Sequence, residues 1–233
     1  MPKRLGQGIG NDSLITNNLY HIYTRTMLGI VPFVERQYLN LIIQLLHHYK
    51  TFNTSYSTHQ KKIKVYSDSD LKLLDNPRGL LKNSIPVKLH GYCIMPNHIH
   101  LVLEQLIDGG IAYYVSRLLN SFTKIYNQDI DRKGTIWESC FKSRVVISDE
   151  IFLQLLRYIH LNPVMSSKLK IIDPEQYIYS SYLDAIGNRD GSLCDHSLLH
   201  SLMKADQYKE FVESKIKDNI LLDEKMLLED LES

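Results

Sequence analysis

GYCIMPNHIHLVLE, residues 91–104, is the stretch from which the fold can be worked out. His98 and His100 stand in an apolar run that is typical of a β-strand, and because strand side chains alternate in direction, both imidazoles point to the same face. Ile99, Leu101 and Leu103 then point to the opposite face. The run therefore predicts a strand with one packed side and one functional side.

A turn and a second strand are expected just before the histidine pair. Pro96 and Asn97 interrupt the preceding apolar run, residues 86–94, and predict a tight turn between two antiparallel strands. Histidine is the commonest metal ligand among side chains, and two imidazoles leave coordination positions open for other ligands. The pattern equally fits two imidazoles that make ordinary hydrogen bonds, so the pair alone leaves both interpretations open.

A second informative stretch, EIFLQLLRYIHLNPV, covers residues 150–164. Its apolar residues recur at helical spacing, and Pro163 is predicted to end the helix. Tyr158 and Asn162 are four residues apart and therefore share a face of this helix. A tyrosine in such a helix can be a half-buried packing residue or a nucleophile, and the spacing by itself favours packing. We expect His160 to be structural rather than a proton shuttle.

The two stretches together, PNHIH and YIHLNP, resemble the HUH single-tyrosine transposases, and most closely the branch called REP-associated tyrosine transposases. NNLYHIYTR at 17–25 is similar to the first strand of that family. GTIWESCFKSR at 134–144 and PEQYIYSSY at 174–182 are similar to the segments before and after its tyrosine helix. The resemblance thus touches most of residues 17–182.

The resemblance implies a role for each motif residue. His98 and His100 would bind a divalent metal, Mg²⁺ or Mn²⁺, and Asn162 would complete the metal shell. Tyr158 would attack a phosphate of single-stranded or hairpin DNA and form a 5′-phosphotyrosine. By softness, two imidazoles would suit zinc better than magnesium. Asn162 is one methylene shorter than the glutamine that some relatives have. The shorter side chain argues against direct ligation of the metal by Asn162, but not against a position of Asn162 close to the metal.

Periodicity predicts the remaining elements: strands at 18–26 and 142–147, and helices at 34–49 and 111–128. This order indicates an α+β fold whose antiparallel sheet carries helices on one face. The resemblance implies a ferredoxin-like or RRM-like sheet with the histidine strand near its centre. We expect Trp137 and Phe141 to anchor the core rather than stack on bases.

Three regions are expected along the chain. The nuclease domain would cover residues 12–182, with an insert near 51–86 that shows no long pattern. Residues 183–233 would add an acidic helical extension, with helices among them at 198–203 and 208–222.

The net charge of +1 conceals an uneven distribution of charge. Residues 1–170 hold 21 Lys and Arg against 12 Asp and Glu, whereas residues 171–233 hold 6 against 14. Because Lys and Arg supply most non-specific nucleic-acid binding energy, phosphate contacts are expected in the front part. The predicted DNA-binding residues are Arg25, Arg117, Lys124, Lys142 and Arg144.

Several protein classes are disfavoured by the sequence. It has no apolar run of eighteen residues and no signal-peptide pattern near Met1, so we expect a cytoplasmic protein without a membrane span. Cys93, Cys140 and Cys194 are odd in number and widely spaced, which fits reduced thiols.

The sequence therefore predicts a transposase or endonuclease that cleaves and rejoins DNA as a monomer or homodimer. A DNA-hairpin-binding regulator without turnover is one alternative. A metal-dependent phosphodiesterase that uses activated water, and forms no covalent adduct, is another.

Overall fold

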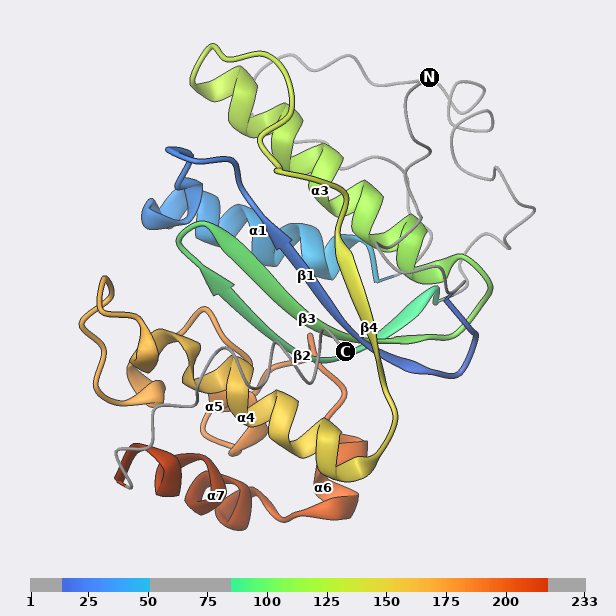
Figure 1. Cartoon of the computed structure of the whole chain (residues 1–233), viewed down its shortest axis with the longest axis vertical. Coiled ribbons are helices and arrows are strands. Elements are labelled where there is room, and N and C mark those ends of the chain that lie inside the picture. Colours follow the sequence, from blue (N-terminus) through green and yellow to red (C-terminus); the bar gives the residue numbers. More distant parts are fainter. Residues whose placement is uncertain (1–13, 51–84, 218–233) are drawn as a thin grey trace.

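A computed structural model describes residues 14–50 and 85–217 of the protein. The predicted insert, apart from residues 85 and 86, and the chain beyond residue 217 lie outside these ranges. The centre of the fold is a four-stranded sheet in the order β2-β3-β1-β4, and all three neighbouring pairs are antiparallel (Figure 1). Its strands are β1 (Leu19–Arg25), β2 (Val87–Met95), β3 (His98–Gln105) and β4 (Lys142–Val146).

The histidine strand is β3, which lies in the interior of the sheet between β2 and β1. β2 ends at Met95 and β3 begins at His98, so the turn falls at Pro96 and Asn97 as predicted. The α+β class, the antiparallel sheet and the interior place of the histidine strand are confirmed.

Two long helices cover one face of the sheet. They are α1 (Arg36–His48), which follows the short turn η1 (Pro32–Val34), and α3 (Gly110–Asp129). Their apolar stripes pack with the sheet side chains that alternate away from the histidines, among them Ile22, Ile99 and Leu101. Burying both stripes against this face removes the apolar surface of all three elements from water.

The other face is also covered, which corrects the prediction of helices on one face. Helix α4 (Asp149–Met165) packs on this face and shares a core with Cys93, Met95 and Val102 of the sheet (Figure 1). Four further short elements follow: η2 (Pro174–Gln176), α5 (Tyr182–Ala185), α6 (Ser197–Leu202) and α7 (Ala205–Lys217). The described part of the C-terminal extension belongs to this second core through Leu199, Tyr208 and others. The alternating pattern predicted helices on one face only, but the histidine face also carries apolar residues against which α4 packs.

Helix α4 also runs past the point where the sequence predicts its end. Pro163 lies inside the helix, which continues to Met165. A proline removes one backbone donor, yet the amide of Ser166 still bonds to the carbonyl of Asn162 at 3.1 Å. A proline in the last turn costs the helix less than one in its middle, because few bonds follow it. At the other end the side chain of Ser148 caps the helix by accepting from the amide of Ile151.

Two further expectations can be compared with the structure. In the described ranges, no helix is long and apolar enough to cross a membrane. The three cysteines are free, as predicted.

Gly91 of β2 sets how closely α4 approaches the sheet. A Cβ at this position would stand 2.5 Å from Cδ2 of Leu156 and 3.3 Å from Cδ1 of Ile159, two residues of α4. A larger side chain would therefore require the side chains of Leu156 and Ile159 to move. The absence of a side chain at Gly91 lets α4 lie directly against the sheet.

We expect Gly91→Ala to destabilise the protein by about 1–3 kcal/mol, the range typical of overpacking in a core. Urea denaturation measures this loss. Leu156→Ala removes the atom that the new Cβ would meet, so the double variant should lose less than the sum of the two single losses. Additive losses would show that the Gly91 contact does not limit the position of α4.

Candidate functional site

One face of the sheet carries the histidine pair together with three residues of β1. In the β1–β3 register, Tyr23 lies opposite His100 and Arg25 lies opposite His98. His21 precedes Tyr23 by two positions and therefore shares this face. The side chains come from neighbouring strands, so their relative positions are fixed by the backbone hydrogen bonds of the sheet.

Both histidines of the pair are held through Nδ1. Nε2 of His21 lies 2.9 Å from Nδ1 of His100, and the two rings stack with an interplanar angle of 10°. His98 donates from Nδ1 to the amide oxygen of Asn97 at 2.8 Å, which leaves the lone pair on its Nε2. Nε2 of His100 is buried and has no hydrogen-bond partner among the described residues.

Burial keeps these imidazoles neutral near pH 7. It lowers the pKa of His98 to about 4, with a smaller contribution from the positive charge of Arg25. It also lowers the pKa of His21 to about 4, assisted by Arg144. The pKa of His100 is held well below its usual value by burial and then by the neighbouring His98 and His21. A neutral imidazole retains the lone pair that a metal ion requires.

Helix α4 places Tyr158 beside the pair. The ring centroids of Tyr158 and His100 are 5.6 Å apart and the rings meet edge to face at 86°. Tyr158 is 7% exposed. The side chain of Asn162 is buried on the same helix face, where its Nδ2 donates to the carbonyl oxygen of Tyr158 at 3.2 Å. The structure therefore brings three of the predicted residues together, and the amide of Asn162 is turned toward its own helix.

These residues could hold a divalent ion. His98 and His100 make their hydrogen bonds through Nδ1, so the Nε2 atom of each ring remains available to a metal ion. Asn162 bonds to Tyr158 through Nδ2, so its amide oxygen is not used in that bond. Within 14–50 and 85–217, no group of three or more His, Cys, Asp or Glu side chains could hold a metal ion. Two imidazole nitrogens and one amide oxygen would leave the remaining ligands of an ion to water or to a phosphate.

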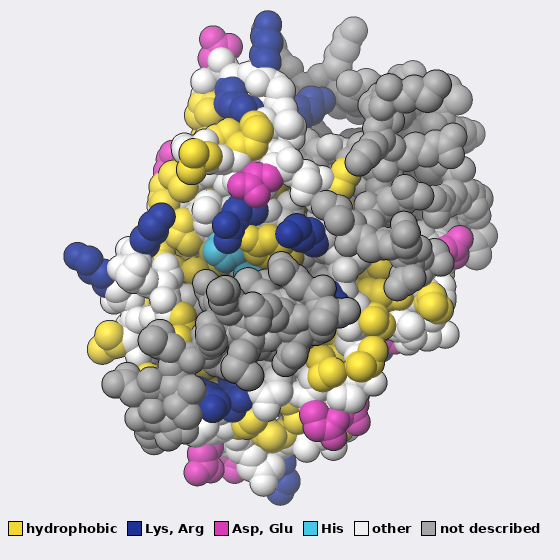
Figure 2. Space-filling view, in the orientation of Figure 1, with side chains coloured by type: hydrophobic (Ala, Val, Ile, Leu, Met, Phe, Trp, Pro, Cys, Tyr) yellow, Lys and Arg dark blue, Asp and Glu magenta, His cyan; other side chains and the backbone are white. Residues whose placement is uncertain are grey.

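The predicted cations divide between the two faces of the sheet. Lys142 pairs with Tyr23 and Arg144 with His21 across β1 and β4, so both belong to the histidine face together with Arg25. A histidine surface surrounded by Lys, Arg and hydrophobic side chains is visible near the middle of Figure 2. Arg117 and Lys124 lie instead on α3, which covers the opposite face, and Arg117 stacks over the ring of Tyr49 at 5.8 Å.

Three residues contribute to the site although the sequence did not predict them as site residues. His21 and Asn97 hold the Nδ1 atoms of the pair, and Tyr23 packs against both of its rings at centroid distances of 5.7 Å and 5.0 Å. The face shared by His21 and Arg25 was visible as a period of two in the sequence. The contact of His21 with His100 was not, because it depends on the pairing of β1 with β3.

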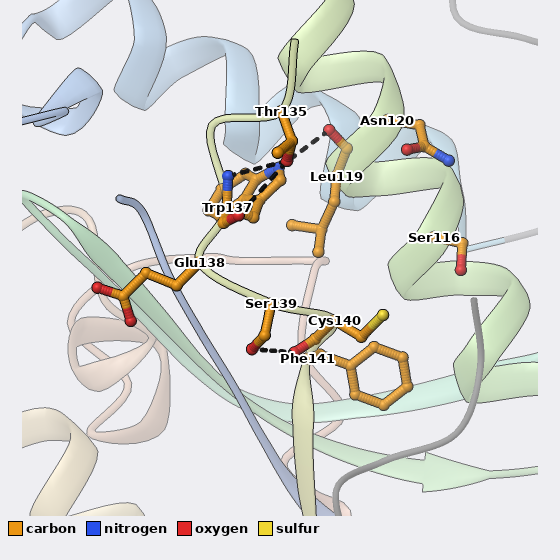
Figure 3. A pocket seen from close by; sticks show the side chains of 9 residues that line it. All are labelled: Ser116, Leu119, Asn120, Thr135, Trp137, Glu138, Ser139, Cys140 and Phe141. Atoms are coloured by element: carbon orange, nitrogen blue, oxygen red, sulfur yellow. Dashed lines mark hydrogen bonds between the residues drawn. The ribbon is translucent and has the colours of Figure 1, made fainter. Parts of the chain in front are cut away.

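Two aromatic residues of the predicted site segment are part of the core. Trp137 and Phe141 are buried, and the indole N–H of Trp137 donates to Oγ1 of Thr123 at 2.9 Å. Both line a pocket between α3 and the segment that leads into β4 (Figure 3). The expectation that they anchor the core agrees with this burial, and the pocket belongs to the α3 side of the sheet.

Comparisons with known proteins agree with the resemblance found in the sequence. No protein-family model matches the chain. A curated protein of Haemophilus influenzae (strain ATCC 51907 / DSM 11121 / KW20 / Rd), named "Putative REP-associated tyrosine transposase", is 26% identical over 107 residues. The match covers 42% of this chain and 60% of that relative.

A solved structure shares the fold. It is described as the REP associates tyrosine transposase bound to a REP hairpin, and it superposes with a TM-score of 0.54 at 12% identity. The superposition covers 82% of this chain and 96% of the other. The predicted resemblance to REP-associated tyrosine transposases is therefore confirmed by one relative of that name and by one shared fold.

His160 provides a test of how α4 is held. Its Nδ1 lies 2.8 Å from the hydroxyl of Tyr208 and its Nε2 2.8 Å from Oγ of Ser181, and the ring is fully buried. We expect His160→Ala to lower the free energy of unfolding by about 2–4 kcal/mol, because it leaves a cavity and removes the hydrogen bonds to the Tyr208 hydroxyl and to Oγ of Ser181. Chemical denaturation measures this, with the exposed His47→Ala as control. Unchanged stability would contradict the structural role and favour proton transfer.

Proposed function

We propose that this protein cleaves and rejoins single-stranded DNA through a covalent bond between Tyr158 and a 5′-phosphate. The observation that carries the proposal is the edge-to-face contact of Tyr158 with His100, whose Nε2 is buried without a partner among the described residues. A nucleophile and an ion site side by side are what phosphoryl transfer to a side chain requires.

The transfer needs little from the protein beyond position. The Tyr158 oxygen, once its proton has left, attacks phosphorus, the bond to the 3′-oxygen breaks, and that oxygen takes up a proton. The phosphotyrosine conserves the energy of the phosphodiester, so a 3′-hydroxyl can later displace Tyr158 and reseal a strand. An Mg²⁺ or Mn²⁺ ion held by His98, His100 and Asn162 would neutralise charge on the non-bridging oxygens.

Contacts to the DNA backbone would come from the histidine face. Arg25 and Lys142 are exposed there, and Arg144 lies beside them on β4. Cations on this face would position a phosphate over Tyr158. We infer a hairpin with a single-stranded flank as the substrate, since the structure with the same fold is described as bound to a REP hairpin. With one nucleophile per chain, strand exchange needs two subunits or two successive uses of Tyr158.

His21 is proposed to position His100. If Nδ1 of His100 donates to Nε2 of His21, the lone pair of His100 is fixed on the Nε2 atom that has no other partner among the described residues. Metal-binding histidines commonly donate their second N–H in this way, and the partner fixes both tautomer and ring orientation. The parallel stacking of the two rings limits rotation of His100 further.

The central prediction is a covalent adduct that depends on Tyr158. Incubated with labelled hairpin DNA and Mn²⁺ or Mg²⁺, the protein should give a labelled band on a denaturing gel. Tyr158→Phe should abolish the band, and His100→Ala should reduce it by two or more orders of magnitude. Tyr182→Phe is the matched control, because the Tyr182 hydroxyl is buried without a hydrogen-bond partner among the described residues; it should retain the band.

Two other results would select the alternatives. Cleavage that survives Tyr158→Phe and leaves no adduct would indicate an activated water, as in a phosphodiesterase. Hairpin binding without cleavage under any metal would indicate a regulator. The tyrosine beside an imidazole whose Nε2 has no hydrogen-bond partner among the described residues favours the enzyme, since a binding protein has no use for that arrangement.

The role of His21 predicts an effect on metal affinity itself. His21→Leu should weaken Mn²⁺ binding by about 10–100-fold, the range known for partners of metal-binding histidines. Titration calorimetry or the electron paramagnetic resonance signal of free Mn²⁺ measures this without DNA. His47→Ala removes an exposed imidazole from α1 and should leave the affinity unchanged. Equal affinities for wild type and His21→Leu would refute the positioning role.

A further inference from the structure

The loop between β1 and α1 exposes several apolar side chains to solvent. Residues 27–34, here called the β1–α1 loop, read MLGIVPFV and carry no charge. Leu28 is completely exposed, Val34 is 62% exposed and Val31 is 45% exposed. Single exposed apolar residues are common on protein surfaces, but several in one short segment are typical of an interaction site.

The tip of this loop has a defined conformation. The amide of Ile30 donates to the carbonyl of Met27 at 3.0 Å, and Gly29 has φ +82°, the value that a type II turn requires at its third position. Oγ1 of the buried Thr26 also donates to the carbonyl of Ile30. Leu28 therefore stands at the apex of a turn that is held from within.

The base of the loop is fixed to the candidate site. The amide of Thr26 donates to the carbonyl of Asn97 at 2.8 Å, and the amide of Phe33 donates to the carbonyl of Pro96 at 3.2 Å. Asn97 is the residue whose side chain holds His98. The loop and the β2–β3 turn accordingly lie together at one end of the sheet (Figure 1).

The surface next to the loop carries charges of both signs, and two of its cations lie on the histidine face. Arg25 lies two residues before the loop, is exposed, and belongs to the histidine face of β1. Lys142 is also exposed, on β4, where it pairs with Tyr23, two residues before Arg25. Glu35 and Glu138 are also exposed near this end. Apolar side chains beside cations on the site face match a nucleic-acid strand, whose phosphates meet the cations and whose bases offer apolar faces.

We propose that the β1–α1 loop is a DNA contact in which Leu28 packs against an unstacked base next to the cleaved phosphate. The proposal rests on the function proposed above. Leucine is one of the side chains that proteins insert at base steps, and a preorganised turn reduces the entropy cost of doing so. The loop would thereby hold the single-stranded flank beside Tyr158 and favour it over paired DNA.

The test uses the Tyr158→Phe background, in which DNA binding is measured without cleavage. Leu28→Ser should weaken binding to a hairpin with a single-stranded flank by about tenfold and leave binding to a blunt hairpin unchanged. Leu28→Met should restore most of the affinity. Ile15→Ser is the matched control, because Ile15 is 58% exposed but lies before the opposite end of β1.

A fluorescent base locates the contact. 2-Aminopurine, placed in turn at each flank position, should brighten on binding at one position as it unstacks, and Leu28→Ser should remove that signal. Equal affinities of Leu28→Ser and its parent for flanked DNA would overturn the loop contact while leaving the proposed function intact. So would a dimer that Leu28→Ser dissociates in sedimentation. Absence of DNA binding by the parent would overturn both proposals.

Discussion

The close contact of α4 with β2 at Gly91 is the constraint on which the site depends. Without a side chain at this position, Leu156 and Ile159 reach the sheet and α4 lies flat on the histidine face. Tyr158 of the same helix lies beside His100, with ring centroids 5.6 Å apart. The helix in turn is held from its outer side by α7, through the bond of His160 to Tyr208. The position of one tyrosine thus depends on packing across two layers.

Burial of the histidine face has a chemical consequence. An imidazole in this environment stays neutral, because a charged ring would lose its hydration, and it must find partners for both nitrogens. The structure gives His98 and His100 a partner at Nδ1, and Nε2 of His100 has none among the described residues. An orphaned buried nitrogen is costly unless something binds it. The proposed metal ion would occupy this position.

Elements with a strong local pattern were predicted well. The alternation around His98 and the 3.6-residue spacing of 150–164 are local periods, which a sequence records directly. Expectations failed where the outcome depended on a neighbour. Pro163 remained inside α4 because a proline in the final turn removes little, and helices covered both faces because Cys93 and Val102 offered α4 an apolar surface. Arg117, expected at DNA, lies on the opposite side of the sheet.

The sequence by itself determined the strand, the turn and the helix, since each follows from the order and spacing of side chains along one segment, whereas the four motif residues were singled out by the resemblance of two segments to a family. It also determined which residues share a face within a strand or helix. Only the tertiary structure decided which segments meet. Pairing of β1 with β3 set His21 against His100, and packing of α4 on Gly91 brought Tyr158 to the same imidazole. Such contacts join residues far apart in the chain, and no local period encodes them.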